Sequence, residues 1–235
     1  MTERAIILNA GKGSRLLPLT SERPKCLIEF RGKAILDHQI EALLPLDLDE
    51  IIIVTGYRGE MITDHIANNV SRYGEKIRTI ANPDWAESSS IASVMAARDY
   101  LSSNYMVMNG DTVYDAAILK KAAGMAKPGT SLLVEPLAEN TEDDMLVKVQ
   151  DGRVMAAAKT LSREAATHRS LGVIFGRSDG GAYRRMLDEV MACSNGHLQY
   201  HHEIINRLAG LQKVHAIESH SGTWQEIDRP EDLVE

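Results

Sequence analysis

Short, wholly apolar runs alternate with amphipathic stretches along the first half of the chain, and this alternation constrains the fold more than any other feature. Residues 5–8 and 51–55 are too short for buried helices and indicate buried strands. Between them, apolar side chains recur at helical spacing over 35–44. Such alternation with short connections predicts an α/β fold with a doubly wound, mostly parallel, Rossmann-like sheet. The other elements expected in this half are strands at 26–30, 77–81 and 105–109 and helices at 59–70 and 90–101.

The second half of the chain has a different pattern. Strand-like segments are more frequent here, and Asp151-Gly152 between two of them indicates a tight hairpin. We therefore expect a small antiparallel appendage on the parallel core. The sequence contains no internal repeat or linker, so residues 1–235 are expected to form a single domain. The expected strands are 131–135, 145–149, 153–157, 171–175 and 214–217, and the expected helices are 181–191 and 200–209.

The charge distribution favours a small anionic ligand. A net charge of −7 argues against a nucleic-acid partner bound through a broad basic surface. Six cations nevertheless fall within a short N-terminal region, which suits a triphosphate. No apolar run reaches the roughly 18 residues of a membrane span, so we expect no membrane partner. The two cysteines fit no disulfide framework, and we expect a cytoplasmic protein. The six cations are Lys12, Arg15, Arg23, Lys25, Arg31 and Lys33.

A glycine-rich segment, NAGKGSR at residues 9–15, directly follows the first expected strand. Glycines let backbone N–H groups approach phosphate oxygens, and nearby cations neutralise the phosphate charge. A Walker A loop would need Ser or Thr where Gly13 stands, and a dinucleotide fingerprint would need glycine at Leu16. Both known loops are therefore excluded. The remaining pattern is Gly-x-Gly-x-Arg, followed by Pro24-Lys25.

This pattern carries a family resemblance. The stretch AIILNAGKGSRLLPLTSERPKCLIEFRGKAILDHQIEAL, residues 5–43, closely resembles the N-terminal signature of sugar-phosphate-type nucleotidyltransferases. It is most similar to their cytidylyltransferase branch, which includes the CTP:phosphocholine and CTP:inositol-1-phosphate cytidylyltransferases. The resemblance covers most of the chain and ends at residues 224–228, WQEID. It implies a nucleotidyltransferase fold and enzyme activity that depends on Mg²⁺.

The resemblance also implies roles for the residues of the loop. The backbone around 10–13 would hold the nucleotide, and Arg15 would stabilise the phosphates that leave as pyrophosphate. Lys25 would contact the α-phosphate and the incoming phosphate, so Arg15 and Lys25 are the expected catalytic residues. Asn9 replaces a small residue of many members and leaves the identity of the base open. The expected nucleotide-binding residues are Leu8, Asn9, Ala10, Gly11, Lys12, Gly13, Asn82, Ser88 and Ser89.

Two acidic elements complete the expected site. Asp111 follows the strand at 105–109, where a carboxylate can reach a ligand in the crevice. Glu226 and Asp228 are two positions apart, so in a strand both would face one side. By resemblance, Asp111 and Asp228 hold Mg²⁺, and Glu226 supports them. Mg²⁺ prefers oxygen ligands and keeps several waters, so two carboxylates and substrate phosphates suffice.

The acceptor side of the site is less defined by the sequence. The serines of segment 82–93 are typical of a helix N-cap. The segment also resembles a loop that lines the nucleotide and acceptor pocket of the cytidylyltransferases. Lys159 stands where the inositol-phosphate enzymes carry a lysine, although a surface lysine has the same pattern. Choline would need aromatic faces, and only 5% of the residues are aromatic. The expected acceptor-binding residues are Lys159, Glu226, Trp85 and Trp224.

These residues predict transfer of CMP from CTP to a small head group, with release of pyrophosphate. The acceptor's phosphate or phosphonate is already a nucleophile, so no general base is needed. Phosphocholine, an aminoalkylphosphonate and inositol phosphate remain open as acceptors.

Other functions remain open beside this one. Within the same reaction type, the alternative is a sugar-1-phosphate uridylyl-, thymidylyl- or guanylyltransferase. From a different functional class, the alternative is a non-catalytic nucleotide-sensing module. An NAD-dependent oxidoreductase is disfavoured by Leu16. The histidines show no metal spacing, and the adjacent His201 and His202 are expected to point apart on a helix.

Overall fold

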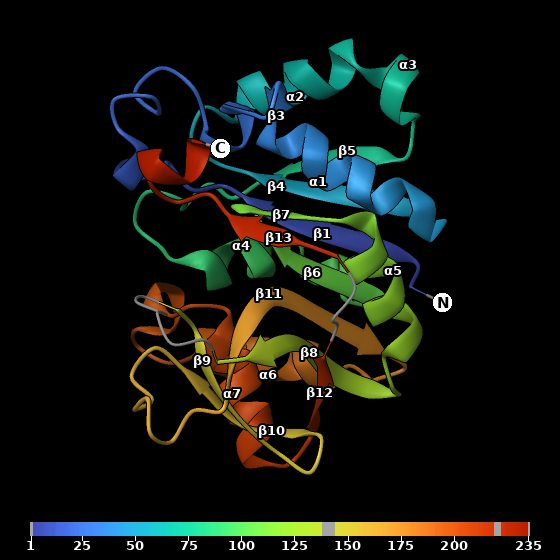
Figure 1. The fold of residues 1–235 in the computed structure, drawn as a ribbon, viewed down its shortest axis with the longest axis vertical. Helices are drawn as coiled ribbons and strands as arrows, with labels where there is room; N and C mark the ends of the chain where they lie inside the picture. Colours follow the sequence, from blue (N-terminus) through green and yellow to red (C-terminus); the bar gives the residue numbers. More distant parts are fainter. Residues whose placement is uncertain (1, 138–143, 219–221, 235) are drawn as a thin grey trace.

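A nine-stranded sheet organises the computed structural model, which describes residues 2–137, 144–218 and 222–234. Its strand order is β5-β4-β1-β6-β11-β8-β12-β10-β9, and it can be followed downward in Figure 1 from β5 to β10. In chain order the strands are β1 (Arg4–Asn9), β4 (Glu50–Thr55), β5 (Ile77–Ala81), β6 (Tyr105–Asn109), β8 (Gly129–Pro136), β9 (Leu146–Gln150), β10 (Arg153–Ala158), β11 (His168–Arg177) and β12 (Val214–Glu218).

The sheet is mixed, which corrects the prediction of a mostly parallel sheet with a small appendage. Strands β5, β4, β1 and β6 are parallel neighbours, as the alternation in the first half predicts. Strand β11 then pairs antiparallel with β6 on one edge and with β8 on the other. The strands of the second half therefore extend the same sheet, because β11 fills the edge that β6 would otherwise leave unpaired.

The predicted hairpin at Asp151-Gly152 is confirmed. Strands β9 and β10 pair antiparallel, with Gln150 opposite Arg153. Asp151 and Gly152 have φ angles of 52° and 71°. Positive φ at both central residues is the requirement of the tight two-residue turn that suits twisted strands.

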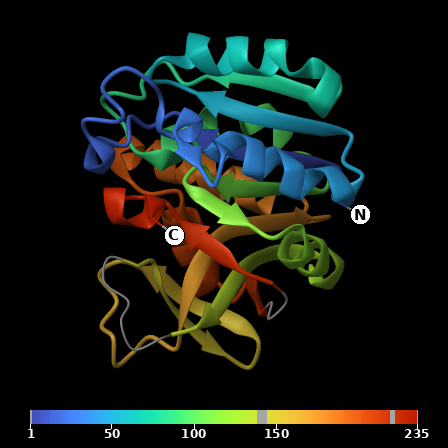
Figure 2. The ribbon, with the colours of Figure 1, turned by 45° about the horizontal axis from the view of Figure 1, so that its top comes forward.

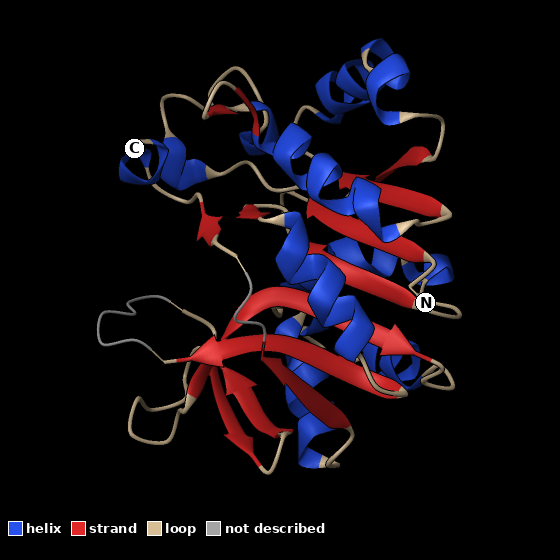
Figure 3. Ribbon diagram, turned by 45° about the vertical axis from the view of Figure 1, so that its right-hand side comes forward, coloured by secondary structure: helices blue, strands red, loops and turns tan. Residues whose placement is uncertain are grey.

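Helices cover both faces of the sheet, as Figure 3 shows. Strand side chains alternate between two cores: Ala5 and Ile7 of β1 lie in one, and Ile6 lies in the other. Burial of both faces explains the unbroken apolar run of β1. None of the described helices is long and apolar enough to cross a bilayer. The first core includes α1 (Ile35–Leu43), α2 (Gly59–Asn68) and α5 (Ala116–Met125), and the second includes α4 (Ser90–Ala96), α6 (Ala182–Met191) and α7 (His202–Gly210).

Some elements differ from the prediction. Residues 26–30 form a 3₁₀ turn and the two-residue strand β2 (Glu29–Phe30), which pairs with β3 (Lys33–Ala34). The predicted helix over 59–70 is divided into α2 and α3 (Val70–Tyr73). Helix α5 and strand β7 (Thr112–Tyr114) were not predicted, because an alanine-rich helix and a three-residue strand give weak apolar periodicity.

A small second sheet brings the last part of the chain to the centre of the molecule. Strand β13 (Trp224–Glu226) pairs antiparallel with β7, and the two strands lie side by side in Figure 2. Glu226 lies opposite Thr112, and the backbone N–H of Ile227 donates to the carbonyl oxygen of Asp111 at 2.8 Å. The segments that carry Asp111 and Asp228 are therefore neighbours.

Candidate active site

The glycine loop leaves the carboxyl end of β1 and leads into a 3₁₀ turn, Ser14–Leu16. Gly13 has a φ of 68°, a conformation that favours glycine. A Cβ atom at Gly13 would lie 2.9 Å from Cβ of Lys25, so the missing side chain lets the loop pack on the Lys25 stem. The Thr20 hydroxyl donates to the carbonyl oxygen of Gly13 at 2.9 Å and fixes the turn from the other side.

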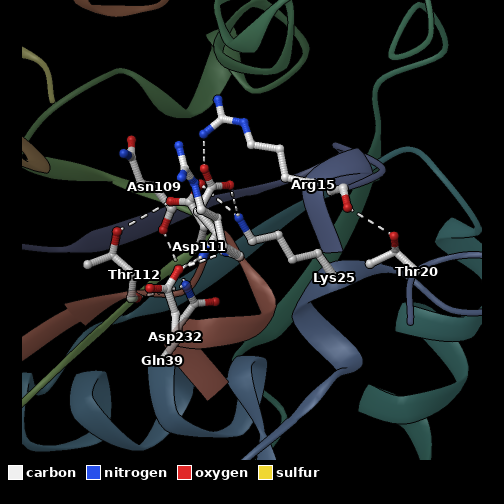
Figure 4. Close-up of polar contacts among 11 residues, drawn as sticks. Arg15, Thr20, Lys25, Gln39, Asn109, Asp111, Thr112 and Asp232 are labelled. Carbon is white, nitrogen blue, oxygen red and sulfur yellow. Dashed lines mark hydrogen bonds and ion pairs between the residues drawn. The ribbon is translucent and has the colours of Figure 1, made fainter. Parts of the chain in front are cut away.

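Two cations and two carboxylates meet beside this loop, and Figure 4 shows Arg15 and Lys25 reaching toward Asp111. The Lys25 ammonium lies 2.9 Å from Oδ1 of Asp228 and 3.3 Å from Oδ2 of Asp111. Arg15 forms an ion pair with the other carboxylate oxygen of Asp228. Burial lowers the pKa of Lys25, but attraction to Asp111 and Asp228 outweighs it and raises the pKa above its ordinary value. Lys25 is therefore a charged ammonium between two acidic groups.

The two carboxylates are held by backbone geometry. Asp111 follows Gly110, where a Cβ atom would lie 2.1 Å from the carbonyl oxygen of Leu8. Gly110 thus lets the end of β6 approach β1 closely. On the other segment, one carboxylate oxygen of Asp232 accepts from the backbone N–H of Asp228 at 2.8 Å and of Arg229 at 2.7 Å. These bonds fix the bend at which the Asp228 side chain turns toward Lys25.

Two cavities meet at this charged cluster. The first, which we call the loop cavity, has a volume of 320 Å³, and the second, the histidine cavity, has a volume of 210 Å³. The loop cavity is lined by Leu8, Asn9, Gly11, Gly13, Ser14, Arg15, Lys25, Cys26, Gly110, Asp111 and Asp228. The histidine cavity shares Leu8, Arg15, Gly110, Asp111 and Asp228, and adds Ser90, Asn109, Asp144, Met145, Lys159, Ser170, Gly172, Tyr200, His201, His202 and Glu226.

The histidine cavity is named for an adjacent pair whose rings lie 4.3 Å apart between centroids. The expectation that His201 and His202 point apart is therefore wrong. Ser90 lies 3.0 Å from Nδ1 of His201, and Ser170 lies 2.9 Å from Nε2 of His202, so two serines hold both rings on one side. Burial lowers the pKa of His201 to about 4 and also lowers that of His202, so both rings are neutral near pH 7.

Glu226 faces both the histidine cavity and a neighbouring surface hollow. This surface hollow is lined by Glu135, Asp144, Arg169, Gly222, Thr223, Trp224, Gln225 and Glu226. Desolvation, together with the negative charges of Asp111 and Asp228, raises the pKa of Glu226 to about 7. The raised pKa reflects first the desolvation of this carboxyl group and then the neighbouring negative charges, which a bound cation would offset. The region between the cavities is thus suited to a ligand that combines phosphate groups with a positive ion.

A family model described as "Nucleotidyl transferase" matches residues 4–144, which include the glycine loop, Lys25 and Asp111. The chain belongs to the nucleotidyl transferase family. The predicted resemblance is confirmed at this level, since the match covers more than half of the chain.

Curated relatives of this nucleotidyl transferase carry several different names. The "Bifunctional protein GlmU" of Methanococcus vannielii is 26% identical over 98% of this chain and 53% of its own length. The "CMP-5'-(3-aminopropyl)phosphonate synthase" of Streptomyces rubellomurinus is 31% identical over 57% of this chain and 21% of its own length. The "CTP:phosphoglutamine cytidylyltransferase" of Campylobacter jejuni is 28% identical, with coverages of 66% and 65%. The chain thus spans about half the length of the first relative and a fifth of the second.

Solved structures have the same fold at low sequence identity. The inositol-1-phosphate CTP transferase of T. maritima superposes with a TM-score of 0.84 at 18% identity, over 99% of this chain and 92% of that one. The CTP:phosphocholine cytidylyltransferase of Streptococcus pneumoniae gives 0.77 at 22%, over 99% and 96%. A UDP-glucose pyrophosphorylase complexed with UDP-glucose gives 0.81 at 14%, over 99% and 96%. These similarities establish the fold and do not distinguish the substrates.

The structure brings four of the nine predicted nucleotide-binding residues to the loop cavity. Leu8, Asn9, Gly11 and Gly13 line it. Ala10 is buried behind them, and its carbonyl oxygen accepts from the backbone N–H of Tyr57 at 2.9 Å. The Lys12 ammonium lies 5.5 Å from the centroid of the Tyr57 ring and does not line either cavity.

The predicted residues of segment 82–90 are placed differently. The amide group of Asn82 is buried, donates to the Ser93 hydroxyl at 3.2 Å and accepts from the backbone N–H of Asp84 at 3.0 Å. The Ser88 hydroxyl donates to the Asp84 carbonyl oxygen at 2.6 Å, and Ser89 is the N-cap residue of α4 without a side-chain capping bond. Of the serines in segment 82–90, Ser90 is the one that lines the histidine cavity.

The predicted acceptor residues fall into two groups. Lys159 and Glu226 line the histidine cavity. Trp224 lies in the neighbouring surface hollow, where its indole N–H donates to Glu135 at 2.9 Å. Trp85 packs edge-on against Tyr57, with ring centroids 5.3 Å apart, and does not line either cavity.

The donor set fits a divalent cation that arrives with a nucleotide. Within the ranges that the structure describes, no three His, Cys, Asp or Glu side chains are arranged to hold a metal ion. Asp111 and Asp228 are nevertheless close enough to share the Lys25 ammonium. Mg²⁺ needs one or two protein carboxylates when substrate phosphates supply further oxygens. The magnesium site at Asp111 and Asp228 stays a prediction.

Sequence reasoning did not find several residues of the histidine cavity. Tyr200, His201, His202 and Ser170 line it, and they come from β11 and the start of α7. The antiparallel pairing of β11 with β6 brings β11 to the site. The segment before α7 is held there by α4, because the Ser90 hydroxyl accepts from the backbone N–H of His201 at 3.0 Å. A polar Tyr-His-His run before an apolar helix was the available signal, and spacing rules for metal ligands did not detect it.

Proposed function

We propose that this nucleotidyl transferase moves CMP from CTP to a small phosphorylated or phosphonate head group and releases pyrophosphate. One observation carries the proposal. Lys25, Arg15, Asp111 and Asp228 form a single charged cluster at the junction of two cavities, one behind a glycine loop and one lined by polar side chains. A triphosphate in the loop cavity and an acceptor in the histidine cavity would place their phosphates at this junction.

The chain's own groups can perform each part of the reaction. Backbone N–H groups of the glycine loop would orient the triphosphate, and Arg15 would neutralise the departing pyrophosphate. Lys25 would contact both the α-phosphate and the acceptor phosphate and so keep them next to each other for the attack. Asp111 and Asp228 would hold Mg²⁺, which when bound supplies Lewis-acid stabilisation of the phosphate charges. The acceptor oxygen attacks the α-phosphorus, the bond to the β-phosphate breaks, and no general base is required.

Several comparisons support CTP as the donor. Names that contain CTP or CMP belong to two of the curated relatives and to two of the structural neighbours described above. The alternative is a sugar-1-phosphate enzyme with another nucleotide, and the similarity to UDP-glucose pyrophosphorylase favours it.

A substrate panel tests the proposal. Pyrophosphate release is measured with Mg²⁺, each of CTP, UTP, dTTP and GTP, and a set of phosphate and phosphonate acceptors that includes glucose 1-phosphate. The proposal predicts release with CTP and a head group, and less with the other nucleotides. Release with UTP or dTTP and a sugar phosphate would replace the head-group assignment. Binding of NTP without release from any acceptor would favour a nucleotide-sensing module.

A further inference from the structure

The histidine cavity carries negative charge that phosphate binding does not explain. Its described lining includes four carboxylates, from Asp111, Asp144, Glu226 and Asp228, and two cations, from Arg15 and Lys159. Lys25 and Arg15 pair with Asp111 and Asp228. Asp144 and Glu226 remain on the cavity wall, where they would repel an acceptor that carried only a phosphate charge.

Asp144 is fixed in place by a hydrogen-bonded group behind the wall. Arg169 donates to Asp144 at 3.0 Å and to Glu135 at 2.7 Å, so one positive charge serves two negative ones. The guanidinium group lies over the ring of Trp224, 4.7 Å from its centroid, and the indole N–H donates to Glu135 at 2.9 Å. Arg169 thus positions the Asp144 carboxylate, but its single positive charge does not neutralise both Asp144 and Glu135.

Glu226 provides the second carboxylate. The negative charges of Asp111 and Asp228 repel its carboxylate, and the Lys25 charge attracts it. It lines the histidine cavity and also the hollow that contains Asp144 and Arg169. Asp144 and Glu226 therefore line the same two spaces and can act on one ligand group.

The aromatic rings of this region favour a primary over a quaternary ammonium. A quaternary ammonium is held mainly by aromatic faces. The ring of Tyr200 already contacts the Lys159 ammonium, 5.2 Å from its centroid, and Trp224 already contacts Arg169. A primary ammonium instead has three N–H donors, which match carboxylate acceptors.

We propose that Asp144 and Glu226 form an ammonium subsite, so the acceptor is a small zwitterion with a primary amine and a phosphate or phosphonate. This inference rests on the proposed nucleotidyl transfer and names the class of its acceptor. The ammonium group would donate to Asp144 and Glu226, while Lys159 and Lys25 would attract the phosphate or phosphonate. Phosphate esters and phosphonates share this chemistry, and separate arms of the test distinguish them.

Matched two-carbon acceptors test the subsite in the wild-type protein. The value of kcat/KM is measured with CTP and 2-aminoethyl phosphate, its trimethyl analogue phosphocholine, and its hydroxyl analogue 2-hydroxyethyl phosphate. 2-Aminoethylphosphonate tests the phosphonate form, and inositol 1-phosphate and glucose 1-phosphate test acceptors without an amine. We expect one of the primary amines to exceed the trimethyl and hydroxyl analogues by about 10-fold or more, the value of a charged hydrogen bond.

The variant Asp144→Asn keeps the shape of the side chain and removes its charge. We expect kcat/KM for the preferred amine to fall about 10- to 100-fold, while that for the hydroxyl analogue changes less than about 3-fold. Asp99→Asn, at a side chain 87% exposed that pairs with Arg184, is the control and should change neither value.

Three results would overturn the inference. The first is a wild-type preference for phosphocholine, inositol 1-phosphate or glucose 1-phosphate, which would leave nucleotidyl transfer intact. The second is an equal loss for amine and hydroxyl acceptors in Asp144→Asn, which would indicate a structural role. The third is the absence of pyrophosphate release with every acceptor and nucleotide, which would reject the proposed function as well.

Discussion

Lys25 and Asp228 are separated by 203 positions in the chain, yet the Lys25 ammonium lies 2.9 Å from the Asp228 carboxylate. Asp111 accepts from the same ammonium at 3.3 Å. The pairing of β13 with β7 brings the two carboxylates to one place, and the glycine loop packs against the stem of Lys25. The lysine therefore holds two negative groups together before any substrate binds.

Replacing Asp228 with asparagine tests the role of that carboxylate. We expect Asp228→Asn to lower kcat by about 10²- to 10³-fold, because charge stabilisation at the reacting phosphates is lost. The midpoint of thermal unfolding should stay close to wild type, since Lys25 keeps Asp111 as a partner. Full activity of the variant at limiting Mg²⁺ would remove Asp228 from the metal site.

Replacing Lys25 with methionine tests whether the two carboxylates can hold a cation. Without the ammonium, Asp111 and Asp228 repel each other, and we expect the free energy of unfolding to fall by about 2–4 kcal/mol in the absence of Mg²⁺. Added Mg²⁺ should raise the melting temperature more in Lys25→Met than in wild type. Lys33→Met, which loses a pair with Glu41, is the control. Equal shifts in all three proteins would contradict a metal site at this pair.

Gly110 and Gly124 provide a matched pair of glycine substitutions. A Cβ atom at Gly110 would lie 2.1 Å from the carbonyl oxygen of Leu8 and 2.3 Å from Oδ1 of Asn9, whereas Gly124 in α5 has no atom within 4 Å. We expect Gly110→Ala to reduce the free energy of unfolding by about 2–3 kcal/mol. Gly124→Ala should increase it by about 0.5–1 kcal/mol. Denaturant unfolding measures both, and equal effects would reject the close approach of β6 to β1.

The parallel strands of the first half were predictable from the sequence pattern of their own segments, whereas β2, β7 and α5 were not. Strands β5 and β6 have the predicted bounds, Ile77–Ala81 and Tyr105–Asn109. The mixed sheet was not predictable, because the edge that β11 occupies depends on contacts distant in the sequence. The same reason applies to the site. Lys25 and Asp111 belong to recognisable motifs, whereas His201 lies at the cavity through a bond from its backbone N–H to the Ser90 hydroxyl, 111 positions away in the chain.

The buried histidine pair predicts a pH dependence of stability. Burial lowers the folded-state pKa of His201 from 6.5 to about 4, so the unfolded chain binds more protons between these values. The stability from neutral His201 is full above pH 6.5 and is lost as pH falls toward 4. We expect His201→Gln to lose less stability over this window than wild type, by denaturant unfolding at each pH. His197→Gln, at an exposed histidine, should retain the wild-type slope, and identical slopes in all three would contradict the buried neutral ring.

The most direct test of nucleotidyl transfer is ³¹P NMR of the products formed from CTP, Mg²⁺ and an acceptor whose phosphate oxygens carry ¹⁸O. The account predicts pyrophosphate and a CMP-linked product in equal amounts, with ¹⁸O at the bridge between the two phosphorus atoms, because the acceptor oxygen attacks the α-phosphorus. CDP, inorganic phosphate, or a bridge without ¹⁸O would contradict it.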